Sequence, residues 1–156
     1  MINWNELFLY MDGELYWKIR GPGRFLNKPA GALTNNGYKA IRFNYKRYLN
    51  HRIIWEMHNE EIPTGLIIDH KDGNKLNNNI SNLRLATLSQ NQGNSKKQRN
   101  NTCGYKGVIK CRNKFQAQIR FNNKKYHLGV FGTPYEAHLA YIAKAKEFFG
   151  EFYKGE

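Results

Sequence analysis

The stretch that decides the fold runs from residue 66 to residue 94 and has the sequence LIIDHKDGNKLNNNISNLRLATLSQNQGN. Its apolar start, residues 66–70, predicts a short strand, and a loop rich in Gly and Asn follows. Residues 83–86 predict a second strand. Thr87 and Gln90 then form a capping-box pattern, so we expect a helix to begin there. The stretch therefore predicts a strand, a polar loop, a second strand and a helix, in that order.

The end of the first predicted strand carries an acid and a base side by side. The chain has only three aspartates, and one of them, Asp69, directly precedes His70. Hydrolysis of a phosphodiester requires a base that deprotonates water and a cation that neutralises the growing charge. A neutral imidazole can be that base near pH 7, and a carboxylate can help to hold a hard divalent ion. On its own, however, this dipeptide is more typical of a surface turn.

The geometry of a strand restricts how these two side chains can cooperate. Neighbouring strand residues point to opposite faces, so Asp69 and His70 can serve one site only if the backbone twists or ends there. The loop that begins at Lys71, Asp72 and Gly73 permits such a twist.

The chain ahead of this stretch predicts short strands divided by turns. Residues 15–19 form the first predicted strand, which Gly and Pro at residues 21–23 interrupt. A turn signal at residues 35–37 precedes an alternating run at residues 38–43. Residues 51–58 follow with a helical pattern of apolar positions.

The chain after residue 104 predicts a complete small domain. Three strands are expected there, at residues 108–109, 115–121 and 126–131. Asn122 and Asn123 form the turn between the last two strands. Thr133, Pro134 and Glu136 are helix-start signals, and apolar residues at helical spacing continue up to Gly150. We therefore expect a three-stranded sheet covered by one helix.

A polar linker is predicted between these two parts. Gly93 weakens the helix before it, which we expect to be short. Lys96, Lys97 and Arg99 give the linker positive charge that can contact phosphates. The predicted domains are residues 1–94, a basic linker at residues 95–104, and residues 105–156.

The charge is unevenly placed along the chain. With 25 Lys and Arg against 12 Asp and Glu, the net charge of the 156 residues is +13. Residues 1–72 hold ten basic and eight acidic side chains, whereas residues 73–135 hold twelve basic and no acidic ones. A long acid-free stretch indicates a polyanionic partner such as nucleic acid, and the balanced first part argues against a chain that merely adheres to ribosomes or membranes.

Several classes of protein are disfavoured by the composition. The sequence has no apolar run of about 18 residues and no secretory signal pattern, so we expect a cytoplasmic protein, in a bacterium or a phage-infected host cell, with no membrane partner. Its cysteines, Cys103 and Cys111, provide neither a disulfide framework nor a four-ligand zinc site, and we expect free thiols.

Several motifs together resemble the HNH endonuclease family, most closely its phage and intron-encoded homing branch. They are HRIIW at residues 51–55, IIDHKDGN at residues 67–74, Asn77 with Asn78, and ISNLR at residues 80–84. The resemblance extends over about residues 7 to 94. It implies a ββα-metal finger, in which two strands and a helix hold one divalent ion. The fold class we expect is therefore α+β: an N-terminal ββα-metal nuclease module, then a C-terminal three-stranded antiparallel sheet packed on one helix.

The HNH resemblance also implies roles for particular residues. His70 corresponds to the general base and Asp69 to a metal ligand. Asn82 corresponds to the middle Asn, which braces the loop and orients His70, so His70 and Asn82 are the expected catalytic residues. Asn91 corresponds to the second metal ligand, and Asn94 is a nearby alternative. Because these metal ligands are oxygens, we expect Mg²⁺ or Mn²⁺ rather than Zn²⁺.

The C-terminal part resembles the AP2 DNA-binding domain over about residues 105 to 149, through YKGV at 105–108, KFQAQIR at 114–120 and LGVF at 128–131. In that family the sheet lies in the major groove and a helix packs behind it. Ile109, Cys111 and His127 depart from the usual family residues, so no target sequence carries over. The residues expected to bind DNA, with the linker cations, are Lys96, Lys97, Arg99, Lys106, Lys110, Arg112, Lys114, Gln118, Arg120, Lys125 and His127.

Together these features predict a metal-dependent endonuclease that hydrolyses phosphodiester bonds of duplex DNA as a homing-type enzyme, with either a nick or a double-strand break as its product. The protein is expected to be a monomer or a homodimer. The alternative is a sequence-specific DNA-binding protein with a degenerate HNH finger, and a third hypothesis is an RNA-binding or ribosome-associated protein. Plasmid cleavage distinguishes the first hypothesis from the other two.

Overall fold

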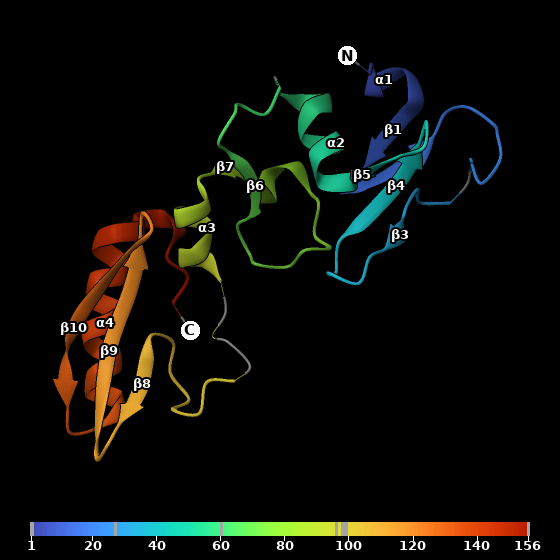
Figure 1. Ribbon diagram of the computed structural model, residues 1–156. Coiled ribbons are helices and arrows are strands. Elements are labelled where there is room, and N and C mark those ends of the chain that lie inside the picture. Colours follow the sequence, from blue (N-terminus) through green and yellow to red (C-terminus); the bar gives the residue numbers. More distant parts are fainter. Residues whose placement is uncertain (1, 27, 60, 96, 98–99, 156) are drawn as a thin grey trace. The chain divides into compact units, whose positions relative to one another are not determined.

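A computed structural model describes the chain except residues 1, 27, 60, 96, 98, 99 and 156. The chain folds into two compact units, Met1–Ala86 and Thr87–Glu156, and each is described by itself. The structure is α+β, with small antiparallel sheets (Figure 1). The module boundaries predicted at residues 94 and 104 stay predictions. The two compact units divide between residues 86 and 87.

The first unit contains three small sheets and one substantial helix. The sheets are β1–β2, β3–β4–β5 and β6–β7, all antiparallel. Its elements are α1 (Trp4–Leu7), β1 (Phe8–Met11), β2 (Glu14–Trp17), β3 (Ala32–Leu33), β4 (Lys39–Phe43), β5 (Lys46–Leu49), α2 (Asn50–His58), β6 (Ile67–His70), the 3-10 helix η1 (Ile80–Asn82) and β7 (Leu83–Ala86).

One apolar core joins the elements of this unit. Ile53 and Ile54 of α2 are fully buried against aromatic residues of α1, β1 and β2. Ile68 of β6 and Leu83 of β7 belong to the same core. The core therefore reaches the strand that ends in Asp69 and His70, so that strand end is held by packing on its apolar neighbours.

The second unit is a three-stranded antiparallel sheet covered on one face by a long helix (Figure 1). The strand order is β10–β9–β8. Its elements are α3 (Leu88–Asn94), β8 (Val108–Cys111), β9 (Lys114–Phe121), β10 (Lys124–Phe131), α4 (Pro134–Phe149) and the 3-10 helix η2 (Gly150–Phe152).

Alternation along β9 decides which face the helix covers. Ala117 and Ile119 are buried on the α4 side, whereas Lys114 and Arg120 are exposed on the other. The two-residue turn at Asn122 and Asn123 has positive φ at both positions, which asparagine tolerates better than most residues. The predicted sheet, its hairpin and its polar face are thus confirmed.

Helix α3 is short, as predicted, but it includes Gly93 instead of ending before it. A Cβ at Gly93 would lie 2.6 Å from Cγ of Phe149, so the close packing of α3 against the end of α4 requires glycine. Both predicted capping boxes are present, at Thr87 with Gln90 and at Thr133 with Glu136.

Candidate functional site

Asp69 and His70 end strand β6 and are both buried. The antiparallel register places Asp69 opposite Arg84 of β7, and Arg84 Nε donates a hydrogen bond to Asp69 Oδ2 at 2.9 Å. A guanidinium paired with a buried carboxylate stabilises its charged form. The first unit therefore presents a buried carboxylate–guanidinium ion pair next to a buried imidazole.

The ring of His70 is held by Asn78. His70 Nε2 lies 2.9 Å from Asn78 Oδ1, and both side chains are buried. An amide oxygen can only accept a hydrogen bond, so Nε2 carries the proton and donates, and the basic lone pair of the neutral ring is on Nδ1. The contact thus selects one tautomer of His70. No role was predicted for Asn78, although it lies in the Asn-rich part of the HNH resemblance.

Asn82 braces the loop that follows His70. Its Nδ2 donates to Asp72 Oδ1 at 3.0 Å and to the carbonyl of Asn77 at 2.8 Å. Its Oδ1 accepts from the backbone N–H of Asp72 at 3.1 Å. Burial raises the pKa of Asp72, but hydrogen bonds from Asn74, Asn77 and Asn82 and the nearby charge of His70 outweigh it, so the net pKa is lowered. The loop is therefore closed around an ionised Asp72.

Two further side chains pack around the imidazole. The His51 ring meets that of His70 edge to face, with centroids 5.1 Å apart, and Tyr38 lies 5.1 Å from His51 by the same measure. Burial, and next the charges of His70 and Arg52, lower the pKa of His51 to about 3. His51 is consequently neutral at neutral pH. Burial, and next the charge of Asp69, raise the pKa of Tyr38.

The two asparagines considered as second metal ligand lie on α3, in the second unit. Asn91 is partly exposed, whereas Asn94 is buried. Asp69, His70 and Asn82 lie together in the first unit. The predicted site residues thus come from β6, from η1 and from α3.

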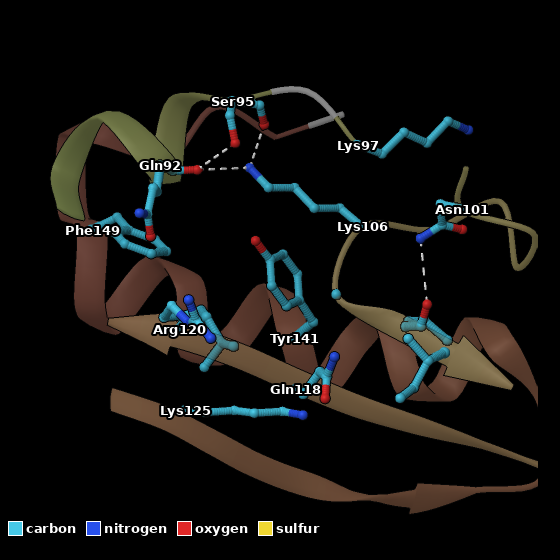
Figure 2. Close-up of a pocket in the computed structure, with 14 residues that line it drawn as sticks. Gln92, Ser95, Lys97, Asn101, Lys106, Gln118, Arg120, Lys125, Tyr141 and Phe149 are labelled. Atoms are coloured by element: carbon cyan, nitrogen blue, oxygen red, sulfur yellow. Dashed lines mark hydrogen bonds between the residues drawn. The ribbon is translucent and has the colours of Figure 1, made fainter. Parts of the chain in front are cut away.

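The last turn of α3 is fastened by Lys106. Its Nζ donates to the carbonyl of Gly93 at 2.9 Å. It also donates to the carbonyls of Gln92 at 3.3 Å and of Ser95 (Figure 2). Lys106 was predicted to bind DNA, but its ammonium lies on the carbonyl end of a helix, where a cation is stabilising. The structure therefore gives Lys106 a role within the second unit.

The face of the sheet opposite α4 carries five of the eleven predicted DNA-binding side chains. Pairing of β9 with β10 places Arg120 beside Lys125 and Gln118 beside His127, with Lys114 at the far end of β9. Residues directly opposite each other on paired strands point to the same face. We call this surface the open face; its residues are Ile109, Cys111, Lys114, Gln116, Gln118, Arg120, Lys125, His127 and Val130.

The remaining predicted DNA contacts lie elsewhere. Lys110 is paired with Phe115, so it projects from the α4 side of the sheet, and Arg112 occupies the turn between β8 and β9. Lys97 donates to the carbonyl of Gly104 at 2.8 Å. Lys96 and Arg99 lie outside the described residues.

A groove of about 570 Å³ borders the open face within the second unit. Lys97, Arg120 and Lys125 line it together with polar groups such as Gln118 (Figure 2). Tyr141 and Phe149 belong to its lining. A groove with several cations and amide groups suits a polyanion.

The described part of the chain contains no cluster of three or more His, Cys, Asp or Glu side chains that could hold a metal. Carboxylates and histidines alone therefore do not form a metal site among these residues, and amide oxygens would have to complete one. No described helix is long and apolar enough to span a membrane. The two cysteines, Cys103 and Cys111, are unpaired thiols.

Residues 48–92 match the family model for HNH endonucleases, and this match includes Asp69, His70, Asn82 and Asn91. The chain is also 33% identical over 159 aligned positions to an uncharacterised HNH endonuclease of Acanthamoeba polyphaga mimivirus, and the alignment covers 93% of this chain and 82% of the relative. The chain belongs to the HNH endonuclease family. It is thus a phosphodiester hydrolase.

Other relatives of this HNH endonuclease come from phages. Protein 3.8 of Escherichia phage T7 is 44% identical over 70 residues, 45% of this chain and 58% of the relative. A prophage-derived protein of Bacillus subtilis strain 168, described as a putative HNH homing endonuclease, is 35% identical over 88 residues, 50% of this chain and 51% of the relative. A solved structure on DNA binding and cleavage by the HNH homing endonuclease I-HmuI aligns with a TM-score of 0.42 at 32% identity, covering 53% of this chain and 47% of that one.

HNH nucleases typically use a divalent metal ion. In this endonuclease, Asp69 is a buried carboxylate that is ion-paired with Arg84, and Asn91 is an amide within the matched region. Carboxylate and amide oxygens are ligands for hard cations, so the residues present fit such an ion.

Proposed function

We propose that this endonuclease hydrolyses phosphodiester bonds of duplex DNA as a homing-type enzyme, producing a nick or a double-strand break. The observation that carries the proposal is the buried pair at the end of β6, in which Asn78 fixes the tautomer of His70 beside the charged Asp69. Such a pair supplies a base and an anionic ligand in one place.

His70 acts as the general base. With the proton on Nε2 held by Asn78, the Nδ1 lone pair accepts a proton from the attacking water. The oxygen of that water forms a bond to phosphorus, and the bond to the leaving deoxyribose oxygen breaks. Asn82 keeps the loop after His70 closed, which holds the imidazole in place during this step.

Asp69 and Asn91 would hold one Mg²⁺ or Mn²⁺ ion. When bound, the ion neutralises charge on the phosphate and the leaving oxygen. Asn91 is the better candidate than Asn94, because it is partly exposed and lies within the matched region, which ends at residue 92. Arg84 is ion-paired with Asp69, so the ion would share this carboxylate with the guanidinium.

The second unit would bind the DNA. It resembles an AP2 domain, and we propose that its open face contacts the duplex through Lys114, Arg120 and Lys125, with Gln118 and His127 between them. The linker cations Lys96, Lys97 and Arg99 would add phosphate contacts. Residues 1–94, 95–104 and 105–156 then act as nuclease module, linker and DNA-binding module.

One observation favours a different function. Arg84 already neutralises Asp69, and a guanidinium so placed competes with a metal ion for the carboxylate. If it excludes the metal, the protein binds DNA without cutting it.

Plasmid cleavage distinguishes the two functions. Supercoiled plasmid is incubated with the purified protein and Mg²⁺ or Mn²⁺, with and without EDTA, beside His70→Ala and His58→Ala variants. His58 is the matched control because it is an exposed histidine on α2.

We expect nicking that requires the metal, disappears in His70→Ala and persists in His58→Ala. Linear product without a nicked intermediate would indicate a dimer. The contrary outcome is that the protein slows the plasmid in the gel without cutting it. If the same holds for a library of phage DNA that offers many candidate sites, cleavage is refuted and the DNA-binding function is supported.

A further inference from the structure

The open face of the β10–β9–β8 sheet has a neutral, partly apolar centre between charged ends. Ile109, Gln116 and Val130 form one cross-strand row, because Gln116 is paired with Ile109 on one side and Val130 on the other. The two apolar side chains are 41% and 48% exposed. The next row holds Gln118 and His127. Single exposed apolar residues are common on protein surfaces, so these two are informative because of the charged residues around them.

The charged residues flank this centre along β9. Lys114 lies at one end, and Arg120 with Lys125 lies at the other. Six strand residues span about 20 Å at roughly 3.3 Å per residue, whereas the DNA major groove is about 12 Å wide. A sheet laid in that groove would therefore place its charged ends over the two phosphate chains and its neutral centre over the base edges.

The chemistry of the centre matches one kind of base pair. Thymine presents a C5 methyl group in the major groove, which favours apolar side chains, and adenine presents a donor and an acceptor that a glutamine amide can pair with. Guanine is matched by Arg or Lys, and the two central rows hold neither.

We propose that Ile109 and Val130 are specificity-determining residues that contact thymine methyl groups, with Gln116 on an adenine edge between them. The sheet then prefers A·T base pairs. This inference rests on the proposed function, since it requires that the second unit bind duplex DNA. The occupant is the major groove, rather than a protein, because the two apolar side chains lie between cations on a chain with no acidic residue from 73 to 135.

The test compares thymine with uracil, which lacks only the methyl group. Full-length protein is titrated in EDTA, so that no cleavage occurs, against duplex poly(dA-dT) and poly(dA-dU) at several salt concentrations. The Ile109→Ala/Val130→Ala variant is compared with Leu139→Ala, a control on α4 with a similar exposure of 47%. Circular dichroism checks that each variant is folded.

We expect wild type and Leu139→Ala to bind the thymine polymer about sixteen-fold more tightly than the uracil polymer, from roughly four-fold for each of two buried methyl groups. The double variant should bind both polymers equally. Equal binding of the two polymers by wild type, with normal salt dependence, would overturn this inference and leave DNA binding intact.

Two other outcomes also overturn it. Absence of binding to either polymer would refute DNA binding by the second unit and the inference together. A dimer in sedimentation that the double variant abolishes, with no difference between thymine and uracil, would assign Ile109 and Val130 to contact between copies of the chain.

Discussion

At the scale of single residues, Asn78 selects the tautomer of His70. Its Oδ1 accepts a hydrogen bond from His70 Nε2, with the two atoms 2.9 Å apart. Asn78→Leu, which keeps a similar shape but removes the acceptor, should weaken the preference of the ring for this tautomer. We expect kcat for plasmid nicking to fall by about 10- to 100-fold, a part of what a general base contributes, while KM changes little. Asn78→Asp keeps an acceptor oxygen and should retain more activity. Equal losses in both variants would contradict tautomer selection.

His51 makes the first unit sensitive to acid. It is neutral when folded, with a pKa of about 3, whereas in the unfolded chain it binds a proton below its ordinary pKa of 6.5. The unfolded state therefore binds more protons, and the stabilisation present above pH 6.5 is lost progressively as the pH falls toward 3. The loss from this group should be about 2 kcal/mol between pH 7 and pH 5.

Urea denaturation measures this effect. All three tryptophans, Trp4, Trp17 and Trp55, belong to the first unit, so their fluorescence reports on it alone. Between pH 7 and pH 5, the free energy of unfolding of His51→Phe should fall by about 2 kcal/mol less than that of the wild type. An unchanged dependence would show that His51 is not the titrating group.

Part of this residue-scale picture could be predicted from the sequence. Asp69, His70 and Asn82 were identified by resemblance, and the structure places them around one loop. Asn78 was missed because it stands in a run of three asparagines, residues 77–79, which differ only in where the fold directs them. Arg84 was missed for a similar reason, since its ion pair depends on the β6–β7 register.

At the scale of elements, α3 is tied to the rest of the second unit at both ends. Ser89 Oγ, near its start, accepts from the backbone N–H of Asn122 at 2.9 Å, and Lys106 Nζ donates to carbonyls at its end. Lys106→Met removes the ammonium from three carbonyls and should destabilise the second unit by about 1–2 kcal/mol, measured by hydrogen exchange of the α3 amides.

The same variant tests whether Lys106 contacts DNA. Because Lys106 is engaged by the helix, the salt dependence of DNA binding should hardly change in Lys106→Met. Lys125→Met should instead lower the magnitude of the slope of log K against log[salt] by about 0.9. A drop of that size in Lys106→Met would support the prediction that Lys106 contacts DNA.

Gly93 reverses the usual effect of alanine in a helix. Gly→Ala inside a helix ordinarily stabilises by about 1 kcal/mol. Here the new Cβ would meet Phe149 at 2.6 Å, so we expect Gly93→Ala to destabilise by about 1–3 kcal/mol in thermal unfolding. Adding Phe149→Leu should recover part of the loss if the clash is its cause, and a further loss would show that it is not.

The helix starts could be predicted from neighbouring residues in the sequence, whereas some strands and the end of α3 depend on residues far away in the sequence. Both capping boxes lie within four consecutive residues, so Thr87 and Thr133 could be identified without the fold. The strands β1 and β5 were not predicted individually, because four-residue strands form only where a partner strand is present. The inclusion of Gly93 in α3 depends on Phe149, which is distant in sequence.

At the scale of the whole molecule, the two units differ in charge. Residues 87–156 hold 13 Lys and Arg against 4 Glu, a net charge of +9, whereas residues 1–86 hold 12 against 8, a net charge of +4. The more basic unit carries the open face, which fits a division into a part that binds and a part that cuts.

Substitution on the open face should separate these two activities. Lys114→Ala/Arg120→Ala/Lys125→Ala removes three cations, so DNA affinity should fall and the salt slope should decrease in magnitude by about 2.7. His70→Ala should bind DNA as wild type does while failing to cut it. Both affinities can be measured by fluorescence anisotropy in EDTA. A wild-type slope in the triple variant would place the phosphate contacts elsewhere.

The attachment of α3 also bears on how such enzymes can be recombined. Helix α3 makes two contacts with residues later in the chain: Gly93 packs against Phe149, and Lys106 binds the last turn. A chimera joined at residue 95 would take the two partners of each contact from different proteins. A chimera that exchanges the DNA-binding part of this nuclease should therefore be joined between Ala86 and Thr87, so that α3 stays with α4, against which it packs. If Asn91 binds the metal as proposed, a chimera that exchanges the DNA-binding part also exchanges one metal ligand, because the seven-residue helix α3 carries Asn91.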